Sequence, residues 1–168
     1  MTFIRALDRS DFDNWLTVYR FYAEHYETDL TDDGIATTWA WLMDSDHPLT
    51  GIVADDNAQL VGLAHYRAMP SPLRGGNLGF LDDLVVAPQD RGSDAAKLLL
   101  GALRSIAKDQ KWAKIRWITR DDNYRARALY DKLATKTNWA MYEMDPDSWR
   151  QKIAGNNMFY ARKATVKT

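Results

Sequence analysis

The order of the predicted elements indicates an α/β fold in which helices flank a mixed, largely antiparallel central sheet. Apolar residues recur at helical spacing in four segments of the chain, and runs of strand-forming residues lie between them. Three predicted strands follow one another, between residues 51 and 86, without an intervening helix. A doubly wound parallel sheet would alternate strands with helices, so a mixed sheet fits this order better.

The first third of the chain begins with a short strand expected at residues 2–6. Asp8 to Ser10 then offer caps for a helix. Aromatic and aliphatic residues recur at helical spacing along one face of that helix: Phe12, Trp15, Leu16, Tyr19, Tyr22 and Tyr26. A second helix is expected over residues 31–43.

The central third contains the strongest strand signals. Residues 51–54 and 59–68 are predicted strands joined by a turn at Asp55–Asp56–Asn57. A loop rich in Pro and Gly covers residues 70–76, and an apolar strand is expected at residues 78–86. A helix should follow, because its apolar positions fall on one face: Ala95, Leu98, Leu99, Ala102, Leu103 and Ile106.

The last third is expected to contain a strand at residues 115–119, a helix at residues 123–133 and a strand at residues 139–144. Residues 146–168 suggest a short helix and then a strand near residues 158–162, an extension of unclear role. No repeat, low-complexity tract or linker divides the chain. A single domain over residues 1–168 is therefore expected.

Composition excludes several classes of function. The hydrophobic fraction of 46% and the charged fraction of 27% are ordinary for a globular protein, and the net charge of −1 gives no general attraction to nucleic acid or an anionic membrane. The chain has no cysteine, which excludes disulfides, thiolate metal sites and cysteine nucleophiles. No signal peptide or apolar run of about 20 residues is found, so a cytoplasmic location is expected. Spacing typical of metal ligands is also absent from the three histidines, and no metal is expected.

The segment after the strand at residues 78–86 is the first candidate for chemistry. A turn containing Gly92 leads into the amphipathic helix that begins near Ala95. The first N–H groups of a helix lack partners and carry partial positive charge, so such a turn can bind a pyrophosphate. The alternative is an ordinary connection in which Ser93 or Asp94 caps the helix.

The second candidate is the pair Asn123 and Tyr130. Seven residues are two helical turns, so the two side chains face roughly the same way. A tyrosine at that place could donate its phenolic proton to a leaving thiolate. The alternative is that Tyr130 belongs to the core beside Leu129 and Leu133.

Together these residues resemble the GNAT superfamily of N-acetyltransferases. Its phosphate-loop signature, Gln/Arg-x-x-Gly-x-Gly/Ala, is matched by Gln89, Arg91 and Gly92, and Ala96 keeps the usual small residue. The later family pattern is matched by Asn123, Ala126 (or Ala128), Leu129 and Tyr130. The strand Leu-Asp-Asp-Leu-Val-Val and the run Trp-Ile-Thr-Arg-Asp-Asp-Asn-Tyr-Arg-Ala-Arg-Ala-Leu-Tyr-Asp are most similar to the histone and polyamine acetyltransferase subgroup.

The resemblance implies the acyl-CoA N-acyltransferase fold and an enzyme that transfers acetyl from acetyl-CoA, its co-substrate, directly to a primary amine. The expected partner is a small-molecule amine such as a polyamine, or a protein lysine. A homodimer is a further candidate assembly. Asn123 is expected to contact the pantetheine arm or to hold the helix, and Tyr130 is expected to protonate the CoA thiolate. The implied cofactor-binding residues are Leu84, Val85, Val86, Arg91, Gly92, Ser93, Asp94, Ala95, Ala96, Asn123 and Tyr130.

The general base implied by the resemblance is Asp82, which matches a glutamate proposed for that role in polyamine acetyltransferases. Alternation along a strand predicts that Asp82 and Asp83 point to opposite faces, so that one of them faces a given cleft. The alternative is that an aspartate here binds a backbone N–H or a basic side chain. Acidic and aromatic residues on the first two helices would suit a cationic acceptor, or they form a solvated acidic face over an aromatic core.

One position departs from the family signature. Asp94 stands where Gly or Ala is usual, and a carboxylate aimed at a pyrophosphate would repel it. Asp is also a good residue at a helix start. This departure supports a second hypothesis, in which the chain is a non-catalytic acyl-CoA sensor or regulatory module.

Overall fold

The computed structural model describes residues 1–146, in two units that meet inside a helix: residues 1–129, and residues from Tyr130 onward. The first unit contains a five-stranded sheet in the order β1-β2-β3-β4-β5, with strands at Phe3–Ala6, Leu49–Asp56, Gln59–Ser71, Gly76–Val86 and Ile115–Arg116. The first four strands pair antiparallel, and β4 pairs parallel with β5. This mixed sheet confirms the predicted fold class.

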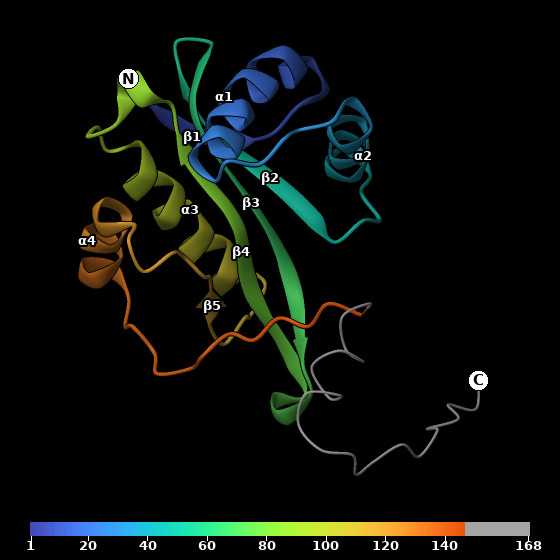
Figure 1. The fold of residues 1–168 in the computed structure, drawn as a ribbon, viewed down its shortest axis with the longest axis vertical. Helices are drawn as coiled ribbons and strands as arrows, with labels where there is room; N and C mark the ends of the chain where they lie inside the picture. The colour runs from blue at the N-terminus through green and yellow to red at the C-terminus, as the bar shows by residue number, and fades with distance from the viewer. Residues whose placement is uncertain (147–168) are drawn as a thin grey trace, which may run out of the picture. The chain divides into compact units, whose positions relative to one another are not determined.

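One face of the sheet is covered by α3 (Ala95–Asp109), whose predicted apolar stripe is buried at Ala95, Leu99 and Leu103. These residues pack against strand residues that point to the same face, among them Ala64, Tyr66 and Leu81. Figure 1 shows α3 lying along β3 and β4, with the β3–β4 hairpin continuing beyond it to the turn η2 (Pro72–Arg74).

The opposite face is covered by α1 (Phe12–His25) and α2 (Asp32–Met43). Trp15 and Val18 of α1 and Ile35 of α2 are buried against Val53, Leu60, Leu63 and Val85 of the sheet. The cap predicted at residues 8–10 forms: Asp8 Oδ1 accepts a hydrogen bond from the Ser10 N–H (2.9 Å) before the short helix η1 (Arg9–Asp11). Thr31 caps α2 by accepting from the Gly34 N–H (3.1 Å). Residues one turn apart on α1 therefore build a single aromatic face toward the sheet.

The β4–β5 pair is short. It joins only Gly79 to Ile115 and Phe80 to Arg116, so the remainder of β4 has no strand on that side within residues 1–129. Gly79 is required there because a Cβ atom would lie 2.5 Å from the Trp112 ring. Within residues 1–129, the outer edge of β4 beyond Phe80 is therefore not paired with a strand.

A β-bulge interrupts the pairing of β3 with β4. His65 pairs with Asp83 and Tyr66 with Leu81, which leaves Asp82 as an extra residue without a partner. An extra residue breaks the alternation of side chains. Leu81 points to the α3 face and Asp83 bonds His65 on the α1 face, while Asp82 bonds Arg67, which lies two residues from His65 on that same face. The prediction that Asp82 and Asp83 point to opposite faces is wrong for this reason.

Other boundaries also differ from the sequence prediction. β3 runs through Met69 to Ser71 because β4 pairs with it as far as Gly76, so the expected loop shrinks to a tight turn. The strand expected at residues 115–119 is limited to Ile115–Arg116, and residues 139–144 form no strand because no described residue pairs with them. The helix and strand expected within residues 146–168 lie, from residue 147 onward, outside the described residues.

Candidate active site

The turn between β4 and α3 presents a set of backbone N–H groups. In the described part of the chain the amides of Arg91, Ser93 and Ala95 already donate to Pro88 O, Asp90 O and Ser93 Oγ. The amides of Gly92, Asp94, Ala96 and Lys97 make no such bond within the same residues. Gly92 has φ +104°, a conformation that favours glycine and that reverses the chain immediately before the helix. The open amides therefore alternate with bonded ones around this turn and into the first helical turn.

Basic side chains surround this turn. Arg91 Nε donates to the Val86 carbonyl (3.5 Å), which brings the guanidinium against the end of β4. A guanidinium nitrogen of Arg125 lies 3.5 Å from the point where a Cβ on Gly92 would stand. Arg125 was missed by the sequence reasoning, because its closeness to the turn follows from the position of α4 (Tyr124–Leu133) and not from any local motif.

Asp94 is turned away from the open amides. Its carboxylate makes no capping bond, is 78% exposed and lies 3.9 Å from Lys97 Nζ. Ser93, not Asp94, provides the side-chain bond at the start of α3. The expected repulsion of a pyrophosphate is therefore weakened by orientation, by solvent and by the neighbouring cations.

We expect Asp94→Gly to change the affinity for CoA by less than about twofold, because a solvent-directed carboxylate contributes little at this distance. Stability should fall by no more than a few tenths of a kcal/mol, since no cap is lost. Calorimetric titration of both proteins measures this. A much tighter complex with Asp94→Gly would show that the carboxylate does approach the phosphates.

The backbone N–H and C=O groups of successive β4 residues point alternately toward β3 and toward the outer edge of the sheet. Ala87 N–H donates to Val61 O on β3, so the N–H and C=O groups of Val86 and Leu84 point the other way, toward the open edge. The Val86 carbonyl is reached there by Arg91, which agrees with this assignment. Val85 is buried in the α1-facing core and bonds toward β3, so of the three predicted residues Leu84 and Val86 are the ones whose backbone can meet a ligand.

On the α1 face, the bulge brings two carboxylates together. Asp82 accepts two hydrogen bonds from Arg67 Nε (3.2 and 3.1 Å), and its side chain is 26% exposed. Burial raises the pKa of Asp82 above its ordinary value; Arg67 opposes this rise and the negative charge of Asp83 adds to it. A raised pKa makes this carboxylate a better proton acceptor than an ordinary surface aspartate.

Asp83 is part of a buried chain of hydrogen bonds. Trp15 Nε1 donates to His65 Nε2 (2.9 Å), and His65 Nδ1 lies 2.8 Å from Asp83 Oδ2. Because an indole nitrogen can only donate, Nε2 must accept, and Nδ1 then carries the proton that is shared with Asp83. His65 is fully buried with both ring nitrogens occupied, so it holds Asp83 in place as a structural residue.

Replacing Trp15 with phenylalanine should destabilise the protein by at least about 1–3 kcal/mol, because the buried His65 Nε2 loses its donor. The matched control is Trp41→Phe, since Trp41 is 45% exposed and stacks on His47 at the surface. Urea denaturation of the three proteins provides the measurement. Equal stability of the two variants would show that the Trp15–His65 bond contributes nothing.

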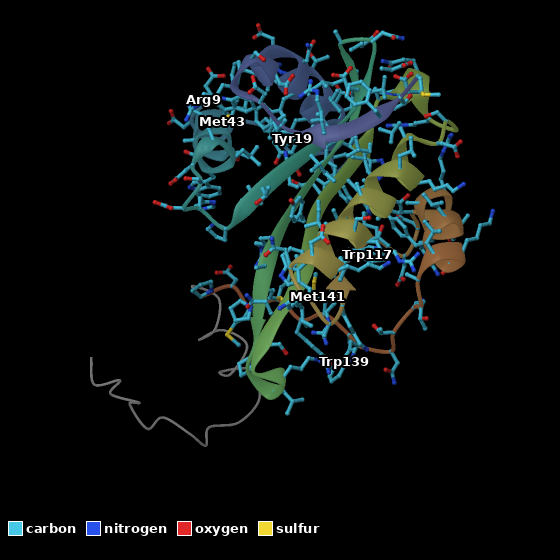
Figure 2. The ribbon with its side chains drawn as sticks, turned by 180° about the vertical axis from the view of Figure 1, so that it is seen from behind. Arg9, Tyr19, Met43, Trp117, Trp139 and Met141 are labelled. Carbon is cyan, nitrogen blue, oxygen red and sulfur yellow. The ribbon has the colours of Figure 1, made fainter. Side chains whose placement is uncertain are left out.

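The tyrosines of α1 cover this chain. Tyr19 lies edge-on to His65, with ring centroids 5.2 Å apart, and projects from α1 toward the sheet (Figure 2). The Tyr22 hydroxyl donates to the Asp82 carbonyl (3.4 Å). Burial and the negative charge of Asp83 raise the pKa of Tyr22 and bring that of Tyr19 to about 12. Both phenols stay protonated at neutral pH and can donate hydrogen bonds at the bulge.

The acidic residues of the first two helices behave mostly as a solvated face. Asp11 is buried because Arg5 pairs with it (2.6 Å), whereas the carboxylates between residues 24 and 33 are exposed. The rings beneath them pack on one another, with Trp15 and Trp39 4.9 Å apart. A separate hollow between η1, the start of α1 and α2 is lined by Arg9 and Met43, which are joined by a hydrogen bond (3.2 Å) and labelled in Figure 2. That hollow contains none of the predicted site residues.

Asn123 holds the start of α4. Its Oδ1 accepts from the Ala126 N–H (3.4 Å) and its Nδ2 donates to Thr119 Oγ1 (3.2 Å), so of its two predicted roles the structure supports the helix cap. Tyr130 follows on the same helix as the first residue of the second unit, and its predicted role as an acid remains a prediction. No helix among the described residues is long and apolar enough to cross a membrane.

Comparison with known proteins decides the family. Residues 11–134 match the sequence model of the acetyltransferase (GNAT) family. The chain belongs to this family. A D-amino-acid N-acetyltransferase of Saccharomyces cerevisiae strain ATCC 204508 / S288c, HPA3, is 25% identical over 142 residues, which make up 83% of this chain and 88% of the relative.

Solved structures share the fold. A ribosomal-protein-alanine N-acetyltransferase from Brucella melitensis biovar Abortus 2308 superposes with a TM-score of 0.73 at 22% identity, covering 86% of this chain and 99% of the other. The aminoglycoside N-acetyltransferase AAC(6')-Iy, solved in complex with CoA, gives a TM-score of 0.73 at 16% identity, covering 87% and 95%. The predictions of a GNAT acetyltransferase and of its fold are thus confirmed.

Proposed function

We propose that the protein transfers an acetyl group from acetyl-CoA to a primary amine, carried by a small molecule such as a polyamine or by a lysine side chain. The observation that carries this proposal is that two different surfaces of β4 carry two different sets of groups. Its outer edge at Leu84 and Val86 leads to the open amides at Gly92, Asp94, Ala96 and Lys97, and its α1 face carries Asp82 and Asp83. One strand thus separates a place for CoA from a place for the acceptor.

The residues fit the phosphates of CoA by their chemistry. Amides at a helix N-terminus and the guanidinium groups of Arg91 and Arg125 suit an anionic pyrophosphate. The backbone of Leu84 and Val86 can bond the amide groups of an extended pantetheine arm as an added strand would. The AAC(6')-Iy structure contains CoA, which supports this co-substrate for the present chain.

The reaction proposed is direct attack. Asp82 takes a proton from the acceptor ammonium, the free amine attacks the acetyl carbonyl, and the C–S bond breaks to release CoA as a thiolate. Tyr130 gives its phenolic proton to that thiolate and is reprotonated through water by the second proton that the attacking nitrogen loses. Asp82 releases its proton to solvent, so the products are an N-acetylated amine, CoA and a proton. The resemblance of the bulge strand and of α4 to histone and polyamine acetyltransferases supports these two roles. The cytoplasmic location and a homodimer stay predictions from the sequence.

Acetyl-CoA should stabilise the protein, because a ligand that binds only the native state shifts the unfolding equilibrium. At about 100 times Kd the gain is about 2.7 kcal/mol. A melting curve with and without acetyl-CoA measures it, with adenosine as a control that lacks the pyrophosphate. The absence of any shift at millimolar acetyl-CoA would contradict the proposed function.

The alternative suggested by the departure at Asp94 is an acyl-CoA sensor, although that carboxylate is directed to solvent. Thiol release over a panel of acceptors separates the two functions. The panel contains polyamines, lysine peptides, aminoglycosides and D-amino acids, the last because the yeast relative is a D-amino-acid N-acetyltransferase. Turnover of an acceptor supports the enzyme, whereas binding of acetyl-CoA without turnover of any amine supports the sensor.

A further inference from the structure

Two arginines flank one phenylalanine in a row across the sheet. Arg67 of β3 pairs with Phe80 of β4, and Phe80 pairs with Arg116 of β5. Arg67 lies two residues from His65 and so shares its α1 face. Ile115 packs against the α3-facing core, so its neighbour Arg116 points to the α1 face as well. Phe80, the middle residue of the row, lies two residues before the bulge residue Asp82 in β4.

The Arg67 guanidinium is held in place, but only some of its N–H donors are hydrogen-bonded. Its Nε donates to both oxygens of Asp82, and the centre of its guanidinium lies 4.9 Å from the centroid of the Phe80 ring. Within residues 1–146 neither Nη nitrogen has a hydrogen-bond partner, and the side chain is 37% exposed. Its Nη donors are therefore oriented and open.

Arg116 adds a second positive charge to the same row. It is exposed, and in the described part of the chain it makes no ion pair. Neighbouring strands are about 4.8 Å apart, so Arg67 and Arg116 stand about 10 Å apart at the backbone and long side chains from both can reach a ligand over Phe80. Two guanidinium groups with open donors suit a carboxylate, to which arginine binds bidentately.

We propose that this row is a carboxylate-binding site and that the acceptor is an α-amino acid, a conclusion that rests on the proposed function. Because Arg67 bonds Asp82 directly, its Nη groups lie close to the Asp82 carboxylate. An α-amino acid carries its amine and carboxylate on one carbon, so it can place the amine at Asp82 and the carboxylate at Arg67. Its Cα substituent would lie over Phe80 and the α1 tyrosines.

Charge also favours this substrate class over a polyamine. Asp82 and Asp83 are matched in charge by Arg67 and Arg116, so these four side chains leave no excess negative charge for a second ammonium group. A polyamine would bring its distant cations against the two guanidinium groups, where like charges repel. A zwitterion has a partner for each of its charges.

The test compares each amino acid with its own amide, for example alanine with alaninamide, in both enantiomers. Thiol release gives kcat/KM for each member of a pair. The wild-type protein should prefer the acid at least about tenfold, and Arg67→Gln should reduce that preference by ~10–100-fold, mainly through the KM of the acid. The amide is an internal control, because any change at Asp82 affects both members of the pair.

Three further variants sharpen the result. Arg116→Gln should reduce the preference for the acid less than Arg67→Gln does. Arg67→Lys should retain part of the preference, because lysine keeps the positive charge but lacks the planar pair of N–H donors that binds a carboxylate bidentately. Arg104→Gln changes an exposed arginine of α3 and should leave the ratio unchanged. A melting curve and the amide rate report whether each variant folds.

An unchanged acid-to-amide ratio in Arg67→Gln would overturn the carboxylate site, as would a wild-type preference for amides or diamines. In either case transfer to amines would still occur, and the proposed function would stand. Absence of turnover with every acid, amide and diamine would overturn the proposed function, and this inference with it.

Discussion

Tyr130→Phe is expected to lower kcat by at least about tenfold, while the Kd for acetyl-CoA stays nearly unchanged. A CoA thiolate leaves poorly unless it is protonated as it departs, and a positioned acid typically contributes ~10²–10⁴-fold. The substitution removes one oxygen and keeps the ring, so the packing of α4 should survive. A fall in kcat without a loss of binding identifies an interaction that is made in the transition state.

The control for this variant lies on the same helix. Tyr124 is 75% exposed, and Tyr124→Phe removes the same oxygen from the first residue of α4. Steady-state kinetics and melting curves on the three proteins separate the two roles of Tyr130. A structural tyrosine would give wild-type kcat with a lowered melting temperature, and that result would leave the thiolate without its assigned acid.

The parts of the site that could be predicted are local in sequence. The strand, the Gly92 turn and the apolar stripe of α3 follow one another within residues 76–109, and each has its own signal. Helix periodicity gives the stripe, and the glycine marks the turn. Asn123 as a cap is likewise local, because a cap bonds a backbone N–H three residues away.

The acceptor side could not be predicted in the same way, because it depends on register. Alternation along β4 assigns Asp82 and Asp83 to opposite faces, and one extra residue in the pairing of β3 with β4 reverses that result. The row of Arg67, Phe80 and Arg116 joins three strands whose residues are 13 and 36 positions apart in the chain. No single-sequence pattern specifies which residues of three strands become neighbours.

The strand expected at residues 139–144 shows a second limit of prediction from the sequence, because residue preference alone does not make a strand. Its aromatic and apolar residues suit a strand, yet a strand exists only where a partner supplies hydrogen bonds. Residues 139–144 have no strand partner among the described residues. Residue preference was therefore insufficient to predict this element.

Asp82→Asn is expected to lower kcat/KM for an alkyl amine by ~10²–10⁴-fold at neutral pH, because the variant cannot remove the ammonium proton. The wild-type rate should rise with pH through the pKa of Asp82, which burial places above the ordinary value of an aspartate. In the variant that acidic limb should disappear. Its rate should instead rise toward the pKa of the amine itself, near 10, where free amine no longer needs a base.

The loss of kcat/KM in Asp82→Asn, measured as a function of pH, therefore distinguishes a base from a structural carboxylate. If Asp82 only anchors Arg67, Asp82→Asn lowers the rate by a similar factor at every pH, since the lost Nε–carboxylate bonds do not depend on the protonation of the acceptor. If Asp82 is the base, the deficit shrinks steadily between pH 7 and pH 10, and it is smaller for an acceptor whose amine has a lower pKa. Asp109→Asn, an exposed aspartate at the end of α3, controls for the change of charge and should follow the wild-type profile. A deficit that is constant in pH and the same for weakly and strongly basic amines would remove Asp82 from the proton transfer and leave it only as the residue that positions Arg67.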